Sequence, residues 1–306
     1  MANDAPRVAV APESAPDWVA EAVRRGGGRV VEPPDAEALV WFGAIQPNDL
    51  APVLAEATRA RWVHLPWAGV EPYVPLLSTD RVWTCGKGVY AEPVAEHAML
   101  LALAGLRDLP RRVRATAWEA SGGTSLYDRR VTIVGGGGIA EELLRHLAVY
   151  RCEVTVVRRR DVPLAGAARL VTVDQLHDAL PGAQVVFLAL ALTPETAGII
   201  GAGELARMDP SAWLVNVARG GHVVTDDLVH ALQTGTIAGA ALDVTDPEPL
   251  PVGHPLWDLP NCIITPHTAN TVDMARPAIE RRITDNVGRF ATGAPLIGLV
   301  DVVAGY

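Results

Sequence analysis

The sequence predicts an α/β fold with two domains, each built on a parallel β-sheet that helices cover on both faces. Strand-like and helix-like segments alternate along the whole chain, which is typical of parallel sheets. The 306 residues are enough for two domains of ordinary size, and the second is expected to begin near residue 100. A glycine-rich turn between a strand-like and a helix-like segment also supports this fold class.

Apolar segments of the first hundred residues predict the elements of the first domain. We expect strands at residues 7–10, 38–41 and 62–65. A helix is expected at 17–25, where three glycines then end it. The run from Glu92 to Leu106 is apolar on every side and therefore indicates a buried helix.

The same alternation continues through the second domain. Further strands are expected at 131–134, 154–157, 171–173, 184–190, 213–217, 238–242 and 262–265. No low-complexity linker interrupts the chain, so we expect rigid helices to connect the two domains.

A Gly-x-Gly-x-x-Ala turn that begins at Gly135 is the most informative motif of the chain. Gly135 permits a tight turn, Gly137 lets the backbone approach a pyrophosphate, and the small Ala140 lets the helix pack close to the strand. The amides of Gly138 and Ile139 can then donate to phosphate oxygens at the helix start. Because a strand precedes the turn and a helix follows it, a dinucleotide site is favoured over a merely permissive loop.

The strand after this turn ends in three arginines, Arg158, Arg159 and Arg160. Arg158 lies 23 residues past Gly135, where NAD-binding domains usually carry an acid that accepts from the ribose hydroxyls. An arginine cannot accept a hydrogen bond, but it can hold a 2′-phosphate through two parallel ones. The position therefore favours NADP(H) over NAD(H), and a solvated arginine loop is the alternative.

Composition excludes several classes of function. Hydrophobic residues make up 49% and charged residues 20%, as in globular proteins, and the net charge of −9 argues against a nucleic-acid partner. No apolar run reaches the roughly 18 residues of a membrane span, and the first residues are too polar for a signal peptide. Cys85, Cys152 and Cys262 lack metal-ligand spacing, so we expect reduced thiols, a cytoplasmic location and no metal site.

Polar residues follow consecutive strands in the second domain. Arg219 comes after one predicted strand, Asp243 and Glu248 come after the next, and His267 comes after the third. Ligands of open parallel sheets bind at the carboxyl ends of strands, so these side chains are expected at one rim. Each has an ordinary alternative, as a turn residue, a solvated loop residue or a helix cap. Together they predict a catalytic site.

The chain resembles the D-isomer-specific 2-hydroxyacid dehydrogenases, and within them the glyoxylate/hydroxypyruvate reductase branch. Besides the glycine turn, the resemblance is carried by residues 88–97, 192–198, 215–220, 241–250, 266–268 and 300–306. It covers nearly the full length and implies two Rossmann-like domains. One is a flavodoxin-like catalytic domain of residues 1–100 and 286–306, and the other is a dinucleotide-binding domain of residues 101–285.

The resemblance implies reduction of a small 2-keto acid to the D-2-hydroxy acid by hydride transfer from NAD(P)H. Arg219 would bind the substrate carboxylate and polarise the keto oxygen, which suits its planar fork. His267 would be the general acid that protonates the developing alkoxide. Glu248 would hydrogen-bond this histidine, and its negative charge would favour the imidazolium form.

Further contacts are implied on the cofactor and substrate sides. Thr193, Ala218 and Asp243 would join the glycine turn in binding the cofactor, with Asp243 on the nicotinamide carboxamide. The amides of a loop would bind the substrate carboxylate, and this loop contains Trp67, Ala68 and Gly69. The bulky Trp67 would either narrow the pocket or merely pack. Other aromatic residues expected to shape the pocket are Trp41, Tyr73 and Trp257.

The family relatives are homodimers, and Trp118 falls in the region where their nucleotide domains pair. An aromatic residue that anchors its own subunit is an equally good interpretation of Trp118. Two other functions stay open: a non-catalytic NAD(P)-sensing binding module, and an NAD-preferring dehydrogenase for a larger D-2-hydroxy acid. A formate- or phosphonate-oxidising relative ranks last, because formate oxidation needs no proton donor to an alkoxide.

Overall fold

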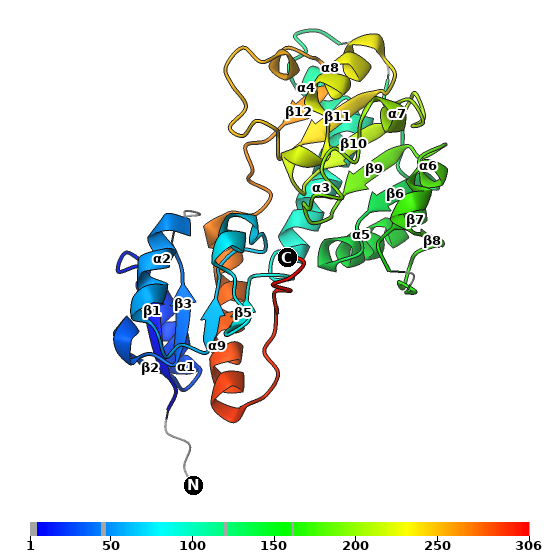
Figure 1. The fold of residues 1–306 in the computed structure, drawn as a ribbon. Helices are drawn as coiled ribbons and strands as arrows, with labels where there is room; N and C mark the ends of the chain where they lie inside the picture. Colours follow the sequence, from blue (N-terminus) through cyan, green and yellow to red (C-terminus); the bar gives the residue numbers. More distant parts are fainter. Residues whose placement is uncertain (1–4, 44–46, 119–121, 161, 306) are drawn as a thin grey trace. The chain divides into compact units, whose positions relative to one another are not determined.

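The computed structural model describes residues 5–43, 47–118, 122–160 and 162–305, and the chain divides into two compact units (Figure 1). Unit 1 comprises Met1–Tyr90 and Thr271–Tyr306, and unit 2 comprises Ala91–Asn270. The expected boundaries at 100/101 and 285/286 differ from these. Each crossing instead falls where a helix begins, at α3 (Ala91–Leu106) and α9 (Val272–Thr292). Each unit is described by itself below.

Unit 1 contains a five-stranded parallel sheet in the order β2-β1-β3-β4-β5. This is the flavodoxin-like strand order. The strands are β1 (Arg7–Ala11), β2 (Arg29–Val30), β3 (Ala38–Trp41), β4 (Trp62–His64) and β5 (Val82–Thr84). β3 has the bounds expected from the sequence. The edge strands β2 and β5 were not expected, because two or three residues are too few to show an alternating pattern.

The helices of unit 1 are α1 (Asp17–Arg25), which has the expected bounds, α2 (Pro47–Glu56) and α9. α1 packs against α9, although more than two hundred residues separate them in the sequence. The contact is close at Gly26, where a Cβ atom would lie 2.6 Å from the carbonyl oxygen of Thr284. The first of the three glycines is therefore needed for helix packing as well as for ending α1.

Trp41 and Tyr73 belong to the core of unit 1, and the expectation that they line a substrate pocket is wrong. Both side chains have no exposed surface, and the Trp41 indole Nε1 donates to the Tyr73 hydroxyl at 3.2 Å. Burial of large aromatic side chains is worth more to the fold than their exposure in a pocket, provided that the polar atom finds a partner. Here the Tyr73 hydroxyl accepts from the indole N–H and so provides a partner for the one polar atom of the Trp41 side chain.

Unit 2 contains a seven-stranded parallel sheet in the order β12-β11-β10-β9-β6-β7-β8. Numbered within the unit, this is the dinucleotide-binding order 3-2-1-4-5-6 with one more strand at the end. The strands are β6 (Arg130–Val134), β7 (Glu153–Val157), β8 (Arg169–Val171), β9 (Val185–Leu188), β10 (Trp213–Asn216), β11 (Gly239–Leu242) and β12 (Cys262–Ile264). The strand order reverses between β6 and β9, so the glycine turn after β6 lies at the switch point where such sheets bind ligands.

One strand of unit 2 is displaced from its expected position. The sequence predicts a strand at 171–173, whereas β8 ends at Val171. Thr172 then caps a 3₁₀ turn, η3 (Val173–Gln175), and its backbone N–H donates to the Gln175 side chain at 3.3 Å. This capping exchange ends the strand before the run of β-branched residues is finished.

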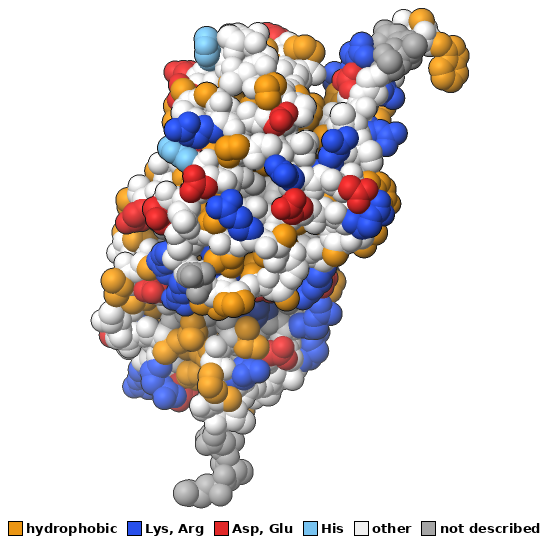
Figure 2. All heavy atoms as spheres, turned by 90° about the vertical axis from the view of Figure 1, so that its right-hand side faces the viewer, with side chains coloured by type: hydrophobic (Ala, Val, Ile, Leu, Met, Phe, Trp, Pro, Cys, Tyr) orange, Lys and Arg blue, Asp and Glu red, His pale blue; other side chains and the backbone are white. Residues whose placement is uncertain are grey.

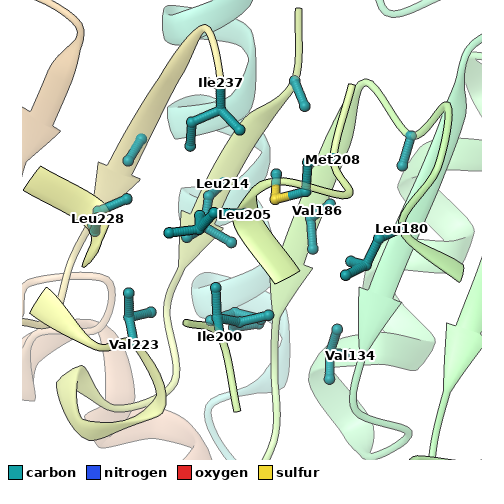
Figure 3. Close-up of a cluster of buried hydrophobic side chains, with 14 of the residues drawn as sticks. Val134, Leu180, Val186, Ile200, Leu205, Met208, Leu214, Val223, Leu228 and Ile237 are labelled. Carbon is teal, nitrogen blue, oxygen red and sulfur yellow. The ribbon is translucent and has the colours of Figure 1, made fainter. Parts of the chain in front are cut away.

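Helices cover both faces of the second sheet (Figure 1). α3 and α5 (Gly138–Val149) cover one face. The other face is covered by α6 (Leu176–Ala179), α7 (Ala202–Leu205) and α8 (Thr225–Thr234), and Figure 3 shows the apolar cluster that joins them to β9 and β10. Its buried members include Val186, Leu205, Leu214 and Leu228. Each such side chain contributes about 1.5–3 kcal/mol through burial.

The surface carries charges of both signs. On the face seen in Figure 2, basic and acidic side chains are interspersed. Within the described residues, no helix combines the length and the apolarity that a membrane span requires. The same part of the chain holds no cluster of three or more His, Cys, Asp or Glu side chains suited to a metal ion.

Candidate active site

The glycine turn of unit 2 has the geometry of a phosphate-binding turn. Gly135 has φ of +129°, and a Cβ atom there would lie 2.0 Å from the carbonyl oxygen of Ala189, so no other residue fits. A Cβ atom on Gly137 would meet nothing within 4 Å, which leaves open space in front of this residue. Ala140 is fully buried where α5 meets the sheet.

The start of α5 presents free backbone donors. Among the described residues, the amides of Gly138 and Ile139 donate to no protein group, and the first helical bond runs from Glu141 N–H to the Gly137 carbonyl at 3.1 Å. Unsatisfied amides and the positive end of the helix dipole together favour an anion at such a position. The turn and the helix start therefore fit the pyrophosphate of a dinucleotide.

Arg158 lies against this turn. A Cβ atom on Gly136 would lie 2.8 Å from Arg158 Nε, and Arg158 Nη1 donates to the Val162 carbonyl at 3.3 Å. Glu195 lies in the predicted cofactor loop that contains Thr193. A hydrogen bond from Thr193 lowers the pKa of Glu195, and the positive charge of the exposed Arg159 adds to this lowering. The structure thus places Arg158 beside the glycine turn.

Arg219 lies on a tightly held loop after β10. Its guanidinium Nη1 donates to the Ala218 carbonyl at 2.7 Å, and its own carbonyl accepts from Asn216 Nδ2 at 2.9 Å. His222, which is fully buried, accepts from the Arg219 N–H at 3.2 Å through Nδ1, and its Nε2 lies 3.2 Å from the Ala191 carbonyl. His222 therefore connects the loop of Arg219 to the loop after β9. The roles of Asn216 and His222 in holding this loop were not predicted from the sequence pattern.

Glu248 and His267 form a pair, as the resemblance implied. The His267 Nδ1 lies 2.6 Å from Glu248 Oε1, and both side chains are about half exposed. Because Nδ1 is engaged by the carboxylate, the other ring nitrogen is the one available to a substrate. The loop of Arg219 also packs closely against the loop of Glu248. A Cβ atom on Gly220, next to Arg219, would lie 1.9 Å from the carbonyl oxygen of Thr245.

Asp243 is almost completely buried beneath this pair, with 2% of its surface exposed. Its Oδ1 accepts from the Thr265 hydroxyl at 2.6 Å and from Thr268 N–H at 2.9 Å, and its Oδ2 accepts from Ala269 N–H at 3.0 Å. Burial alone would raise the pKa of Asp243, but hydrogen bonds from His97, Thr265 and these amides outweigh it and lower the pKa. The structure therefore gives Asp243 a role in holding the His267 loop, and its contact with a nicotinamide stays a prediction.

Trp67 packs within unit 1. Its ring lies 5.9 Å from that of Phe42 and 6.3 Å from that of Tyr90, measured between centroids. The indole Nε1 is buried without a hydrogen-bond partner among the described residues. Of the two expectations for this residue, packing is therefore what the structure displays.

The backbone of the loop that contains Ala68 and Gly69 is oriented by its carbonyl groups. Three of these carbonyls accept hydrogen bonds from the segment 85–90. The Tyr90 hydroxyl donates to the Pro66 carbonyl, and the Gly86 N–H donates to the Trp67 carbonyl at 3.0 Å. The Cys85 thiol donates to the Ala68 carbonyl at 3.7 Å. The amides of Ala68 and Gly69 have no partner in the described part of the chain. Since the carbonyls are engaged, free amides remain for a carboxylate. This loop belongs to unit 1, whereas Arg219, Glu248 and His267 belong to unit 2.

Two other aromatic residues lie at the surface. Trp257 is 49% exposed, and its Nε1 donates to the Pro251 carbonyl at 3.0 Å. Trp118 is fully exposed, so the interpretation that it anchors its own subunit is wrong. Its neighbours along the chain, Leu109 and Val113, are also exposed apolar residues.

Comparisons with known proteins agree with this geometry. Residues 97–269, which lie within unit 2, match the family described as D-isomer specific 2-hydroxyacid dehydrogenase, NAD binding domain. A glyoxylate/hydroxypyruvate reductase A of Serratia proteamaculans is 36% identical over 176 residues, which cover 58% of this chain and 56% of that relative.

Two solved structures resemble the whole chain. A D-isomer specific 2-hydroxyacid dehydrogenase from Xanthobacter autotrophicus, in complex with NADPH, has a TM-score of 0.86 at 26% identity and covers 99% of this chain and 100% of its own. An NADPH-dependent glyoxylate/hydroxypyruvate reductase from Sinorhizobium meliloti, in complex with NADP and sulfate, has a TM-score of 0.83 at 25% identity and covers 98% and 100%. The chain therefore belongs to the enzyme family of D-isomer specific 2-hydroxyacid dehydrogenases.

Proposed function

We propose that the protein reduces a small 2-keto acid of the glyoxylate/hydroxypyruvate type to the D-2-hydroxy acid and uses NADP(H). The observation that carries the proposal is the Glu248–His267 pair, 2.6 Å apart and accessible, next to the loop of Arg219. The relatives from Serratia and Sinorhizobium are named as glyoxylate/hydroxypyruvate reductases, which supports this substrate class.

Each residue of the site has a chemical task in this reaction. The planar fork of Arg219 holds the substrate carboxylate and polarises the keto oxygen. The carboxylate of Glu248 stabilises a proton on the His267 ring and fixes the ring through Nδ1, so that Nε2 can protonate the alkoxide oxygen. A bound nicotinamide would supply the hydride for the keto carbon. The amides of Gly138 and Ile139 would hold its pyrophosphate.

A kinetic panel tests this proposal. Glyoxylate, hydroxypyruvate, pyruvate and phenylpyruvate are each assayed with NADPH and with NADH. The highest kcat/KM is expected with NADPH and one of the first two substrates. A preference for NADH and phenylpyruvate would instead favour a dehydrogenase for a larger D-2-hydroxy acid, and tight cofactor binding without turnover would favour a sensing module.

The preference for NADP(H) is proposed to rest on Arg158. This residue borders the glycine turn, where an acid would repel a 2′-phosphate and a guanidinium attracts one. Both solved relatives bind NADPH or NADP, which supports the same cofactor here.

Arg158→Asp is expected to lower kcat/KM for NADPH by about 10- to 100-fold, since a charge-assisted contact of about 1.5–3 kcal/mol is lost. The kcat with saturating NADH should stay largely intact. Arg158→Gln keeps the stem that packs on Gly136 and serves as the control for packing. Steady-state kinetics with both cofactors at rising salt would check this, because screening should narrow the difference between them. Equal use of NADPH and NADH by the wild type would contradict it.

A homodimer and a cytoplasmic location are further parts of the proposal. The apolar residues Leu109, Val113 and Trp118 are exposed and lie close together in the sequence, which supports an interface in this region. The cytoplasmic location stays a prediction from the spacing of the cysteines.

Sedimentation equilibrium should give about twice the chain mass of 32.4 kDa for the wild type. Trp118→Ser should weaken the dimer by roughly 10-fold or more, because buried tryptophans dominate interface energies. Val303→Ser, which removes an exposed apolar side chain from unit 1, is the control. A Trp118→Ser protein that dimerises as tightly as wild type would place Trp118 outside the interface.

A further inference from the structure

The backbone at His267 is held in an unusual conformation. Its φ is +54°, in the left-handed region that non-glycine residues seldom adopt unless their surroundings impose it. The His267 N–H donates to the Asp243 carbonyl at 2.8 Å. The next two amides, of Thr268 and Ala269, donate to the two carboxylate oxygens of Asp243 at 2.9 and 3.0 Å. Asp243 thus holds the turn of His267 on both sides of the strained residue.

Two side chains hold Asp243 in turn. Thr265 follows the last residue of β12, and His97 belongs to α3. The Thr265 hydroxyl donates to Asp243 Oδ1 at 2.6 Å, and His97 Nε2 lies 3.0 Å from the same hydroxyl oxygen. A hydroxyl has a single hydrogen. Since Thr265 donates this hydrogen to the carboxylate, its oxygen accepts from His97, and the His97 Nε2 carries a hydrogen.

These hydrogen bonds therefore converge on the carboxylate of Asp243 from both ends. His97 donates to Thr265, Thr265 donates to Asp243, and Asp243 accepts from the turn of His267. His97 Nε2 also lies 3.4 Å from Asp243 Oδ1, within ion-pair distance. The lowered pKa of Asp243 agrees with a carboxylate that stays ionised and can accept from every donor around it.

We propose that His97 and Thr265 are positioning residues that act through Asp243 to fix His267 in its left-handed conformation, with its ring on Glu248. The proposal rests on the proposed function insofar as His267 is the proton donor. Neither His97 nor Thr265 is assigned a contact with substrate. Their effect is on geometry. The hydrogen bonds from His97 to Thr265 and from Thr265 to Asp243 are called the relay below. When either bond is removed, the turn relaxes, and the His267 ring is correctly placed in fewer molecules.

Kinetics of matched variants test the relay. His97→Leu and Thr265→Val each remove one link, and each is expected to lower kcat about 10- to 100-fold, because small displacements of a reacting group are costly. The KM values for keto acid and cofactor should change by less than about 3-fold, since ground-state binding is retained. The double variant should be no worse than the more impaired single one, as expected for two members of one network. His97→Gln keeps a donor, and Thr265→Ser keeps the hydroxyl, so both should restore kcat.

Thr132→Val is the matched control. Thr132 is also buried in unit 2, and its hydroxyl donates to the Ala179 carbonyl at 2.5 Å, far from the relay in sequence. Its loss should cost stability and leave kcat unchanged. If Thr265→Val and Thr132→Val lose stability and kcat alike, or if Thr265→Ser fails to rescue, the relay has only a structural role and the proposal is overturned.

Amide hydrogen exchange separates this proposal from the proposed function. In His97→Leu and Thr265→Val, the amides of Thr268 and Ala269 should exchange faster than in wild type, while those of β6 keep their protection. Unchanged exchange at both amides would overturn the relay whatever the activity. A wild type that reduces no 2-keto acid would refute the proposed function, and the exchange data would still decide whether the relay holds the turn.

Discussion

His267→Ala is expected to lower kcat for 2-keto acid reduction by about 10²–10⁴-fold, the usual range for the loss of a general acid. The side chain is half exposed, and its only described bond is to Glu248. Removing it should therefore change the free energy of unfolding by no more than about 0.5 kcal/mol. Steady-state kinetics together with urea unfolding would separate the loss of chemistry from a loss of fold. A variant with near-normal kcat would contradict the role of His267.

Glu248→Gln tests the role of Glu248 in the same reaction. The substitution removes the negative charge that lies 2.6 Å from His267 Nδ1 and leaves a side chain of nearly the same shape. The kcat for reduction should fall, because the proton donor loses its charged partner. An unchanged kcat would mean that the contact between the two side chains has no effect on the reaction.

Much of the fold could be predicted because its signals are local. α1 and β3 have the bounds that apolar periodicity gave, and the glycine turn lies between a strand and a helix as expected. The failures have physical causes. Edge strands of two or three residues show no periodicity, and the capping exchange at Thr172 ends β8 inside a β-branched run.

The candidate site was predictable only as far as strand order determines it. Arg219, Glu248 and His267 follow neighbouring strands of one parallel sheet, so their common rim could be predicted without coordinates. The partners of Asp243 could not, because His97 and Thr265 are 168 residues apart and no local pattern connects them. An aromatic residue such as Trp41 suits a pocket as well as a core, and only the packed unit reveals its burial and its hydrogen bond to Tyr73.

Arg219→Lys is expected to raise KM for the keto acid and to lower kcat, with kcat/KM falling about 10- to 100-fold or more. Lysine keeps the positive charge but has no planar fork, so it cannot hold a carboxylate through two parallel hydrogen bonds while it polarises the keto oxygen. It would also lose the geometry in which Nη1 donates to the Ala218 carbonyl at 2.7 Å. The charge alone should preserve part of the substrate affinity, and that part is what the lysine variant measures.

Cofactor binding and a second substitution complete this test. The dissociation constant for NADPH should stay within about 3-fold of wild type, because Arg219 is assigned to the substrate and not to the cofactor. Arg207→Lys makes the same chemical change at an exposed position of unit 2 and should alter neither kcat nor KM. If Arg219→Lys behaves like Arg207→Lys, the fork makes no contact that matters in the transition state, and the substrate carboxylate is held elsewhere. A loss confined to KM would mean that Arg219 binds the substrate without polarising its keto oxygen, since only an interaction that strengthens in the transition state affects kcat.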